Sequence, residues 1–354
     1  MIKPWSDKLR KVDPYVPGEQ SKKQNIIKLN ANENPYPPSP KVVEAIHNFD
    51  TDKLCLYPNS SAYQLTEALA QHYGLDMNQV FVGNGSDEVI ALAYMAYFNS
   101  PDKPILFPDI TYSFYPVWCN FFKTPYLTKA VDENFRINAK DYYEKNGGVI
   151  IPNPNAPTGM SEGREFIEEI LQHNQDVVVI IDEAYVDFGS YSAVELLKKY
   201  ENLVIVHTFS KSRSLAGMRI GVALGNPELI SLLNAVKNCY NSYTLDSVAI
   251  AAGTASVNDD TYFLSTLNKV IETRERTAKE LSDLGFKVFP SHSNFLFVTH
   301  PTISAKELFE AAKAENIFIR FFDLPRINNH LRISIGTDAQ MDALIGFIKK
   351  YQGR

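Results

Sequence analysis

The sequence predicts an α/β protein, with a mostly parallel sheet in a large domain followed by a smaller α+β domain. Short apolar runs alternate with segments of helical or loop character, which is typical of chains that build parallel sheets. One run, VVVII at 177–181, is β-branched throughout, as expected for a strand buried on both faces. The pattern changes near residue 245, where a long helical stretch begins. We therefore expect two sheets of different kinds.

The first part of the chain carries the elements expected of the large domain. Strands are expected at 80–82, 104–107, 149–151, 177–181 and 203–206. A helix is expected to begin after Ser39, since serine caps helices well and Pro40 suits a first turn. A second helix is expected to stop at Gly74.

The last part predicts a smaller unit. A helical stretch runs to Gly285, and strands are expected near 286–289, 294–298, 317–321 and 331–335, with helices near 304–315 and 337–350. We predict three divisions of the chain: an N-terminal segment joining the small domain (1–45), a large domain (46–245) and a small C-terminal domain (246–354).

Composition and charge exclude several classes of protein. The chain has 354 residues and a net charge of −6, which argues against a general affinity for nucleic acid or anionic membranes. No apolar run approaches the roughly 18–20 residues that span a bilayer. The N-terminus lacks the apolar core of a signal peptide. We expect a cytoplasmic protein.

Cysteine and histidine spacing points away from disulfides and metals. Cys55, Cys119 and Cys239 are far apart and odd in number, so we expect buried small hydrophobes rather than disulfides. The seven histidines form no HExxH motif, and no CxxC is present, so no metal site is expected.

The stretch TFSKSRSLAGMRIG (208–221) gives the strongest indication of chemistry. Lys211 follows an apolar run, 203–206, that predicts a buried strand. A lysine at such a strand end is partly desolvated, which favours the neutral, nucleophilic amine that imine chemistry needs. Arg219 adds a planar fork suited to phosphate. The alternative is a Lys–Arg loop on the surface.

Two acidic residues end another buried strand. Asp182 and Glu183 follow the run at 177–181, and Tyr185 comes next but one. Ligands in open α/β folds lie at the carboxyl ends of strands, and a carboxylate buried there needs a cationic partner. A protonated ring nitrogen or a metal would serve, and capping of a helix is the simpler alternative.

Two turns complete the set. In FVGNGSDEVIALAYMAYF (81–98) a strand leads through glycines into a helix, whose N-terminal N–H groups at Gly85, Ser86 and Asp87 suit a phosphate. An ordinary capped turn fits equally well. The loop VIIPNPNAPTGM (149–160) alone indicates only a turn.

Together these residues match the needs of pyridoxal phosphate. Lys211 supplies an amine for an imine, and Asp182 supplies a carboxylate for a ring nitrogen. The turn at 85–87, the hydroxyls of Thr208 and Ser210, and Arg219 supply a phosphate site.

At this point the chain resembles the fold-type-I pyridoxal-phosphate enzymes related to aspartate aminotransferase, over nearly its whole length. The segments that carry the resemblance occur in the family's order and spacing: PYVPG, KLNANENPYPPSP, YPN, GNGSDE, NPNAPTG, DEAY, TFSKSRSLAGMRIG and LRISIGT. LNANENPY and LRISIGT are typical of the histidinol-phosphate branch.

The resemblance implies a role for each cofactor-site residue. Lys211 forms the imine and moves the proton between the substrate α-carbon and the cofactor C4′. Asp182 pairs with the pyridine nitrogen, Tyr185 donates to the phenolic oxygen, and Tyr112 stacks on the ring. The residues implied at the cofactor phosphate are Gly85, Ser86, Asp87, Thr208, Ser210 and Arg219.

Two further assignments depend on resemblance alone. Many relatives carry asparagine directly before Pro-Thr-Gly, where this chain has Ala156, so the contact to the phenolic oxygen falls to Asn155. Tyr57, in LYPNS, is implied to reach the phosphate of the neighbouring subunit. A homodimer with shared sites is therefore expected.

The resemblance also implies the substrate end. Arg332, Arg320 and Tyr15 match positions that bind the substrate's anionic groups, with Asn155 nearby. The expected reaction moves an amino group between L-histidinol phosphate and 2-oxoglutarate, in histidine biosynthesis. Decarboxylation of threonine phosphate and a broad or aromatic aminotransferase remain alternatives on the same scaffold.

Overall fold

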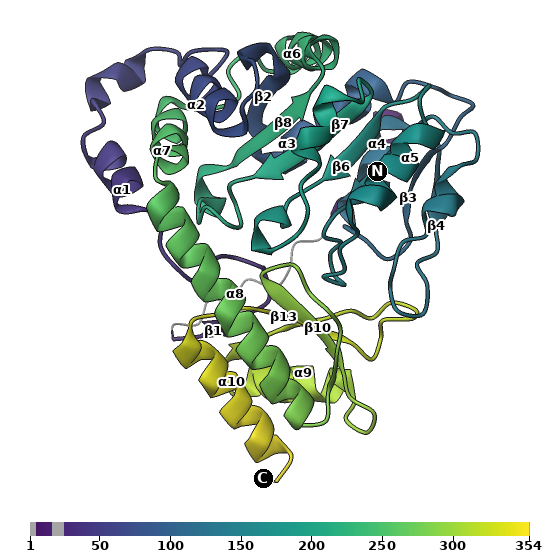
Figure 1. The fold of residues 1–354 in the computed structure, drawn as a ribbon, viewed down its shortest axis with the longest axis vertical. Helices are drawn as coiled ribbons and strands as arrows, with labels where there is room; N and C mark the ends of the chain where they lie inside the picture. The colour runs from purple at the N-terminus through teal and green to yellow at the C-terminus, as the bar shows by residue number, and fades with distance from the viewer. Residues whose placement is uncertain (1–4, 16–24, 354) are drawn as a thin grey trace.

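A seven-stranded sheet forms the centre of the larger part of the molecule (Figure 1). The structure is a computed structural model that describes residues 5–15 and 25–353. The sheet has the order β2-β8-β7-β6-β5-β3-β4. Its strands are β2 (Val80–Asn84), β3 (Ile105–Pro108), β4 (Tyr126–Lys129), β5 (Gly148–Pro152), β6 (Val179–Asp182), β7 (Leu203–Thr208) and β8 (Ile220–Gly225). The strand β8 runs antiparallel to both of its neighbours, β2 and β7, and every other pair in the sheet is parallel, so the predicted mostly parallel sheet is confirmed.

Helices cover both faces of this sheet because successive strand residues point to opposite sides. Ile181 and Ile205 face one apolar cluster, which contains residues of α2 (Tyr63–Tyr73), α5 (Arg164–His173) and α7 (Ser247–Val257). The intervening residues Ile180 and Val204 face the other cluster. That cluster takes in α3 (Gly85–Tyr97), α4 (Phe114–Phe122) and α6 (Pro227–Tyr240).

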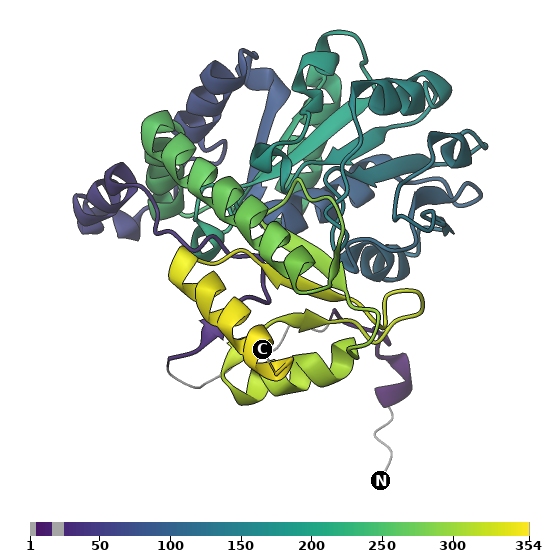
Figure 2. The same ribbon diagram turned by 60° about the horizontal axis from the view of Figure 1, so that its bottom comes forward.

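A smaller unit lies below this sheet in Figure 1 and carries its own core. Its four-stranded sheet has the order β12-β13-β10-β9. The strands are β9 (Lys287–Val288), β10 (Phe295–Thr299), β12 (Arg320–Phe321) and β13 (Leu331–Ser334), and the helices are α8 (Asp260–Asp283), α9 (Ala305–Ala314) and α10 (Asp338–Tyr351). Figure 2 shows α10 beside α8, the long helix that runs from the large sheet into this unit.

The N-terminal segment pairs with the smaller unit. The strand β1 (Ile27–Lys28) lies parallel to β11 (Ile317–Phe318), and Leu29 belongs to the smaller core. The chain then enters α1 (Pro40–His47), where Ser39 accepts a hydrogen bond from the Val42 N–H as expected of a cap. The division of the chain into residues 1–45, 46–245 and 246–354 stays a prediction.

Several local predictions were wrong. The strands β4 and β8 were not expected, and the helical stretch after residue 245 is divided into α7 and α8, with Asn258 and Asp259 between them. Cys119 is buried as predicted, but Cys55 and Cys239 are exposed. Within residues 5–15 and 25–353, no helix is long and apolar enough to span a membrane.

Candidate functional site

Two adjoining cavities open at the carboxyl ends of β5, β6 and β7. The inner cavity measures about 220 Å³ and the outer cavity about 710 Å³. Six residues line both of them: Ala31, Glu33, Tyr112, Ala156, Tyr185 and Lys211. The cavities therefore share a wall, and Lys211 lies where they meet.

Lys211 is half-buried three residues beyond β7, where the sequence placed it. Its Nζ atom lies 5.6 Å from the centre of the Tyr185 ring. The amide of Asn34 donates to the carbonyls of Lys211 and Ser212, at 3.1 Å each, and so fixes the backbone that carries the amine. The lysine thus projects into the site from a loop that is restrained from the N-terminal segment.

Asp182 ends β6 and presents a buried carboxylate to the inner cavity. The carboxylate accepts hydrogen bonds from the Tyr115 hydroxyl at 2.7 Å and from the Ala184 N–H at 3.2 Å. Burial raises the pKa of Asp182 to about 6 despite these two donors. A cationic group in the inner cavity would therefore stabilise its charged form.

Glu183, the other acidic residue of this pair, points elsewhere. It accepts hydrogen bonds from the Ser192 hydroxyl and the Ala193 N–H and pairs with the His207 ring at 2.7 Å. It lines neither cavity. No group of three or more metal-ligating side chains occurs in the described part of the chain.

The N-terminus of α3 forms the far end of the inner cavity. Gly85 has a φ of +80°, and a Cβ placed there would lie 2.3 Å from the guanidinium of Arg219. A Cβ on Gly221 would lie 2.4 Å from the Ser86 N–H nitrogen. Only glycine at both positions lets these backbones and Arg219 approach one another, which leaves the first N–H groups of the helix beside the guanidinium. Such an arrangement suits an anion.

Hydroxyl groups and a carboxylate organise this end. The Arg219 guanidinium donates to Ser210 Oγ at 3.3 Å, and Thr208 Oγ1 donates to the same atom at 3.1 Å. Asp87 pairs with Arg219 at 3.2 Å and accepts from the Tyr112 hydroxyl at 2.8 Å. Asp87 therefore orients Arg219 and Tyr112, and only its backbone N–H is suited to an anion.

The outer cavity is lined by arginines from the smaller unit. Arg320 and Arg332 lie opposite each other on β12 and β13. The Arg332 guanidinium donates to the Asn30 carbonyl at 3.1 Å, but its buried Nε has no hydrogen-bond partner among the described residues. Burial, with Arg320 adding to it, lowers the pKa of Arg332. An anion here would stabilise both charges.

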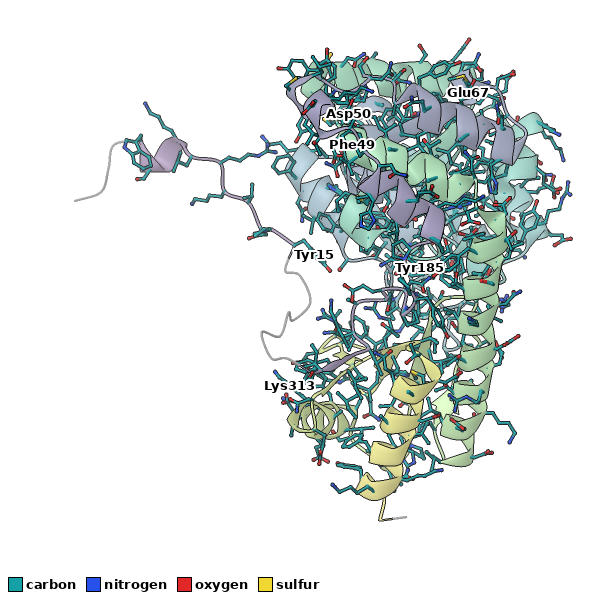
Figure 3. All side chains as sticks on the ribbon, turned by 90° about the vertical axis from the view of Figure 1, so that its left-hand side faces the viewer. Tyr15, Phe49, Asp50, Glu67, Tyr185 and Lys313 are labelled. Carbon is teal, nitrogen blue, oxygen red and sulfur yellow. The ribbon has the colours of Figure 1, made fainter. Side chains whose placement is uncertain are left out.

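Tyr15 also lines the outer cavity, where its ring stacks on Phe114 with the ring centres 4.5 Å apart. Figure 3 shows Tyr15 and Tyr185 at the level where the upper and lower parts of the molecule meet. The outer cavity is therefore built by three parts of the chain: the N-terminal segment, the large sheet and the smaller unit.

Three predicted residues do not line the cavities. Gly85 is the first residue of α3 and lines neither cavity, although the next two residues, Ser86 and Asp87, line the inner one. Asn155 is fully buried; its amide donates to the Ile110 carbonyl and accepts from Thr111 Oγ1, and it lines neither cavity, whereas Ala156 lines both. Tyr57 is 82% exposed and stacks on Tyr243. Their roles stay predictions.

Sequence reasoning missed two hydrogen-bonding partners in the site. Tyr115 reaches Asp182 from α4, and Asn32 reaches the Tyr185 hydroxyl at 3.0 Å. Tyr115 lies in a largely apolar stretch, where a tyrosine is expected to be part of the core. No local sequence pattern indicates the contact of Asn32. Asn32 does lie in LNANENPY, the segment typical of the histidinol-phosphate branch.

The fold and the site define a class of protein, and comparison with known sequences gives the same class. The chain belongs to the family of class I and II aminotransferases, which it matches over residues 24–348. Its relatives include the histidinol-phosphate aminotransferase of Lactococcus lactis subsp. cremoris, 50% identical over 98% of this chain and 97% of the relative. The histidinol-phosphate aminotransferase of Acinetobacter baumannii is 52% identical over 98% and 96%.

Solved structures share the fold. The histidinol-phosphate aminotransferase of Clostridium acetobutylicum matches with a TM-score of 0.84 at 24% identity, over 92% of this chain and 99% of that one. The enzyme of Sinorhizobium meliloti, solved in complex with pyridoxal-5′-phosphate, matches with a TM-score of 0.83 at 24% identity, over 92% and 91%. The expected fold-type-I architecture is thereby confirmed.

Proposed function

We propose that this protein is a pyridoxal-phosphate-dependent aminotransferase that converts L-histidinol phosphate and 2-oxoglutarate into imidazole acetol phosphate and L-glutamate, in histidine biosynthesis. The identity of 50–52% to histidinol-phosphate aminotransferases over nearly the whole chain carries this proposal. The two cavities agree with it, because one offers a lysine, a carboxylate and an anion site, and the other offers two arginines.

The inner cavity fits the proposed cofactor. At the end lined by Ser86 and Arg219, a Cβ on Gly85 would meet the Arg219 guanidinium, and a Cβ on Gly221 would meet the backbone of Gly85 and Ser86. Asp182 lies on the same cavity wall with a carboxylate that lacks a cationic partner among its hydrogen bonds. Residues proposed to hold the cofactor phosphate are Ser86, Asp87 through its N–H, Thr208, Ser210 and Arg219.

When bound, pyridoxal phosphate supplies an electron sink that acidifies the α-hydrogen of the substrate. Lys211 then carries a proton between the substrate α-carbon and the cofactor C4′, since its amine lies where the two cavities meet. Asp182 keeps the ring nitrogen protonated, and Tyr185 donates to the phenolic oxygen. Tyr112 lines both cavities and covers a ring face.

The outer cavity selects the substrate. Arg332 and Arg320 bind the phosphate of histidinol phosphate in one half-reaction and a carboxylate of 2-oxoglutarate in the other, with Tyr15 beside them. Charge-assisted contacts of this kind are worth about 1.5–3 kcal/mol each. The unpartnered Nε of Arg332 supports this assignment.

We also propose that two copies of the chain associate. Tyr57 stacks on Tyr243, and both rings are exposed, as are Leu54 and Leu56 just before Tyr57 in the chain and Tyr240 just before Tyr243. Covering them with a second copy would bury this surface and bring Tyr57 toward the partner's inner cavity.

The function is tested by incubating the purified, cofactor-loaded protein separately with L-histidinol phosphate, O-phosphothreonine and phenylalanine. We expect the cofactor absorbance to change fastest with histidinol phosphate. Once 2-oxoglutarate is added, one glutamate should form for each histidinol phosphate consumed. Release of carbon dioxide from phosphothreonine would establish the decarboxylase instead. A solved L-threonine-O-3-phosphate decarboxylase from Porphyromonas gingivalis shares the fold at 20% identity.

A further inference from the structure

Asn32 joins the N-terminal segment to the cofactor site and to the smaller unit at once. Its side chain is 1% exposed, and its backbone has a φ of 54°. The amide Nδ2 donates to the Tyr185 hydroxyl at 3.0 Å, and Oδ1 accepts from Ser334 Oγ at 2.9 Å. The backbone N–H of Asn32 donates to the same Ser334 Oγ at 2.8 Å. Ser334 therefore contacts Asn32 twice.

These contacts fix the direction of every proton in the chain of hydrogen bonds. A backbone N–H can only donate, so Ser334 Oγ accepts from it and uses its single proton on Asn32 Oδ1. The amide oxygen then faces Ser334 and the amide nitrogen faces Tyr185. The reverse orientation would aim two donors at Ser334 Oγ and deprive its proton of the Asn32 acceptor.

The Tyr185 hydroxyl is consequently left with a free donor. Since it accepts from Asn32, its one proton points elsewhere, and Tyr185 lines both cavities. Ser334 lies two residues after Arg332 on β13, so both side chains project to the same side of that strand. The strand β13 therefore carries both Arg332, which lines the outer cavity, and Ser334, which fixes the orientation of the Asn32 amide beside Tyr185.

We propose that Asn32, held by Ser334, is a positioning residue that keeps the Tyr185 hydroxyl as a hydrogen-bond donor toward the phenolic oxygen of the cofactor. This inference rests on the proposed cofactor but not on the identity of the substrate. It assigns a purpose to the pairing of β1 with β11, which brings residues 29–34 against β13.

The test compares the cofactor-loaded wild type with Asn32→Asp, Tyr185→Phe and the double variant. A carboxylate can only accept, so in Asn32→Asp it takes the Tyr185 proton away from the cofactor. The phenolic oxygen then loses a donor that stabilises its charged form. We expect the pH midpoint of the cofactor absorbance change to rise by about 1 unit.

The other titratable and charged residues around Tyr185 are the same in all of these variants. The titratable and charged side chains that line the cavities beside it are Tyr15, Lys28, Glu33, Asp87, Asp109, Tyr112, Asp182, Lys211, Arg219, Arg320, Arg326 and Arg332. A new carboxylate could raise the midpoint through its charge alone, and the double variant separates this effect. If Asn32 acts through Tyr185, the shift from Asn32→Asp is much smaller in the Tyr185→Phe background.

Ser334→Ala provides an independent variant that adds no charge. Loss of the hydroxyl releases the amide, and we expect a smaller upward shift of the midpoint. Ser293→Ala is the matched control, because Ser293 is fully buried and its Oγ has no hydrogen-bond partner among the described residues. That control should leave the midpoint unchanged.

The outcomes separate this inference from the proposed function. Equal shifts from Asn32→Asp with and without the Tyr185 hydroxyl, or equal midpoints for Ser334→Ala and wild type, would overturn the positioning role and leave the function standing. The expected shifts together with turnover of a different amine would overturn the substrate and leave the positioning role standing. A wild type that takes up no pyridoxal phosphate would overturn both.

Discussion

The inner and outer cavities differ in how their charged groups are partnered. In the inner cavity Asp182 accepts from Tyr115, and Arg219 is held by Ser210 and Asp87. In the outer cavity Arg332 and Arg320 face each other, and the Arg332 Nε is unpartnered among the described residues. Groups that are oriented by the protein suit a resident cofactor, whereas spare donors suit a ligand that comes and goes.

Removing the lysine between the cavities should have the largest effect. Lys211→Ala eliminates the group proposed to carry the proton, so turnover should fall by at least about 10³-fold, and the characteristic cofactor absorbance should be lost. The measurement is single-turnover kinetics with histidinol phosphate. Lys279→Ala, at an exposed lysine of α8, is the control. Normal turnover by Lys211→Ala would contradict the mechanism.

Removing an arginine of the outer cavity should weaken the use of substrate without weakening the binding of cofactor in the inner cavity. Arg332→Ala should lower kcat/KM for the phosphorylated amine by about 100-fold, since charged hydrogen bonds are lost, while cofactor binding is unchanged. Steady-state kinetics and cofactor titration check this, with Arg276→Ala on the surface of α8 as control. If Arg332→Ala lowers kcat/KM for a non-phosphorylated analogue by the same factor, the arginine does not bind the phosphate.

Weakening the support of Asp182 should affect only the inner cavity. Tyr115→Phe removes a hydrogen bond to the charged carboxylate, so the pKa of Asp182 should rise further and cofactor affinity should fall by about 10-fold near pH 6. Equilibrium dialysis between pH 5 and 8 measures both. Tyr94→Phe, at a neighbouring buried tyrosine, is the control, and the same loss there would show a packing effect.

The smallest effect concerns the stability of the cofactor-free protein. Because burial raises the pKa of Asp182 from 3.8 to about 6, the folded state binds a proton more readily than the unfolded state. Stability from this group is therefore present at low pH and is lost as pH rises from about 4 to about 6, by about 3 kcal/mol.

Asp182→Asn has no charge to bury and should lack this decline. Melting temperatures of the cofactor-free proteins from pH 4 to 7 measure it, and parallel curves for wild type and variant would show that the carboxylate is not desolvated. Added cofactor should stabilise the wild type more than the variant at pH 7, since only the wild type offers a negative charge to the ring nitrogen.

The fold was predictable where residues of one kind occur in runs. The strands β5, β6 and β7 are continuous apolar segments, and the sequence placed each of them. The strand β8, IGVALG, was missed because its glycines resemble a turn, although one of them, Gly221, permits the close approach to Ser86. The strand β4, YLTK, is partly exposed and has no apolar run.

The site was predictable where a residue acts from its own strand end. Asp182 ends β6, Lys211 follows the end of β7 by three residues, and both line the inner cavity, as expected. The partners that orient them could not be found, because Asn32 and Ser334 are separated by 302 residues and meet only when the sheets assemble. Asn155 was assigned by position in a motif, and the structure buries its amide against Ile110 and Thr111.

The pairing of β1 with β11 has a consequence for the order of synthesis. Every strand of the seven-stranded sheet has been synthesised once residue 225 has been added, well over 100 residues before the chain ends. Residues 27–34 emerge long before that, yet their partners at 317–334 are almost the last to appear. The nascent chain can therefore assemble its central sheet early, but it completes the site around Tyr185 only when translation is nearly finished.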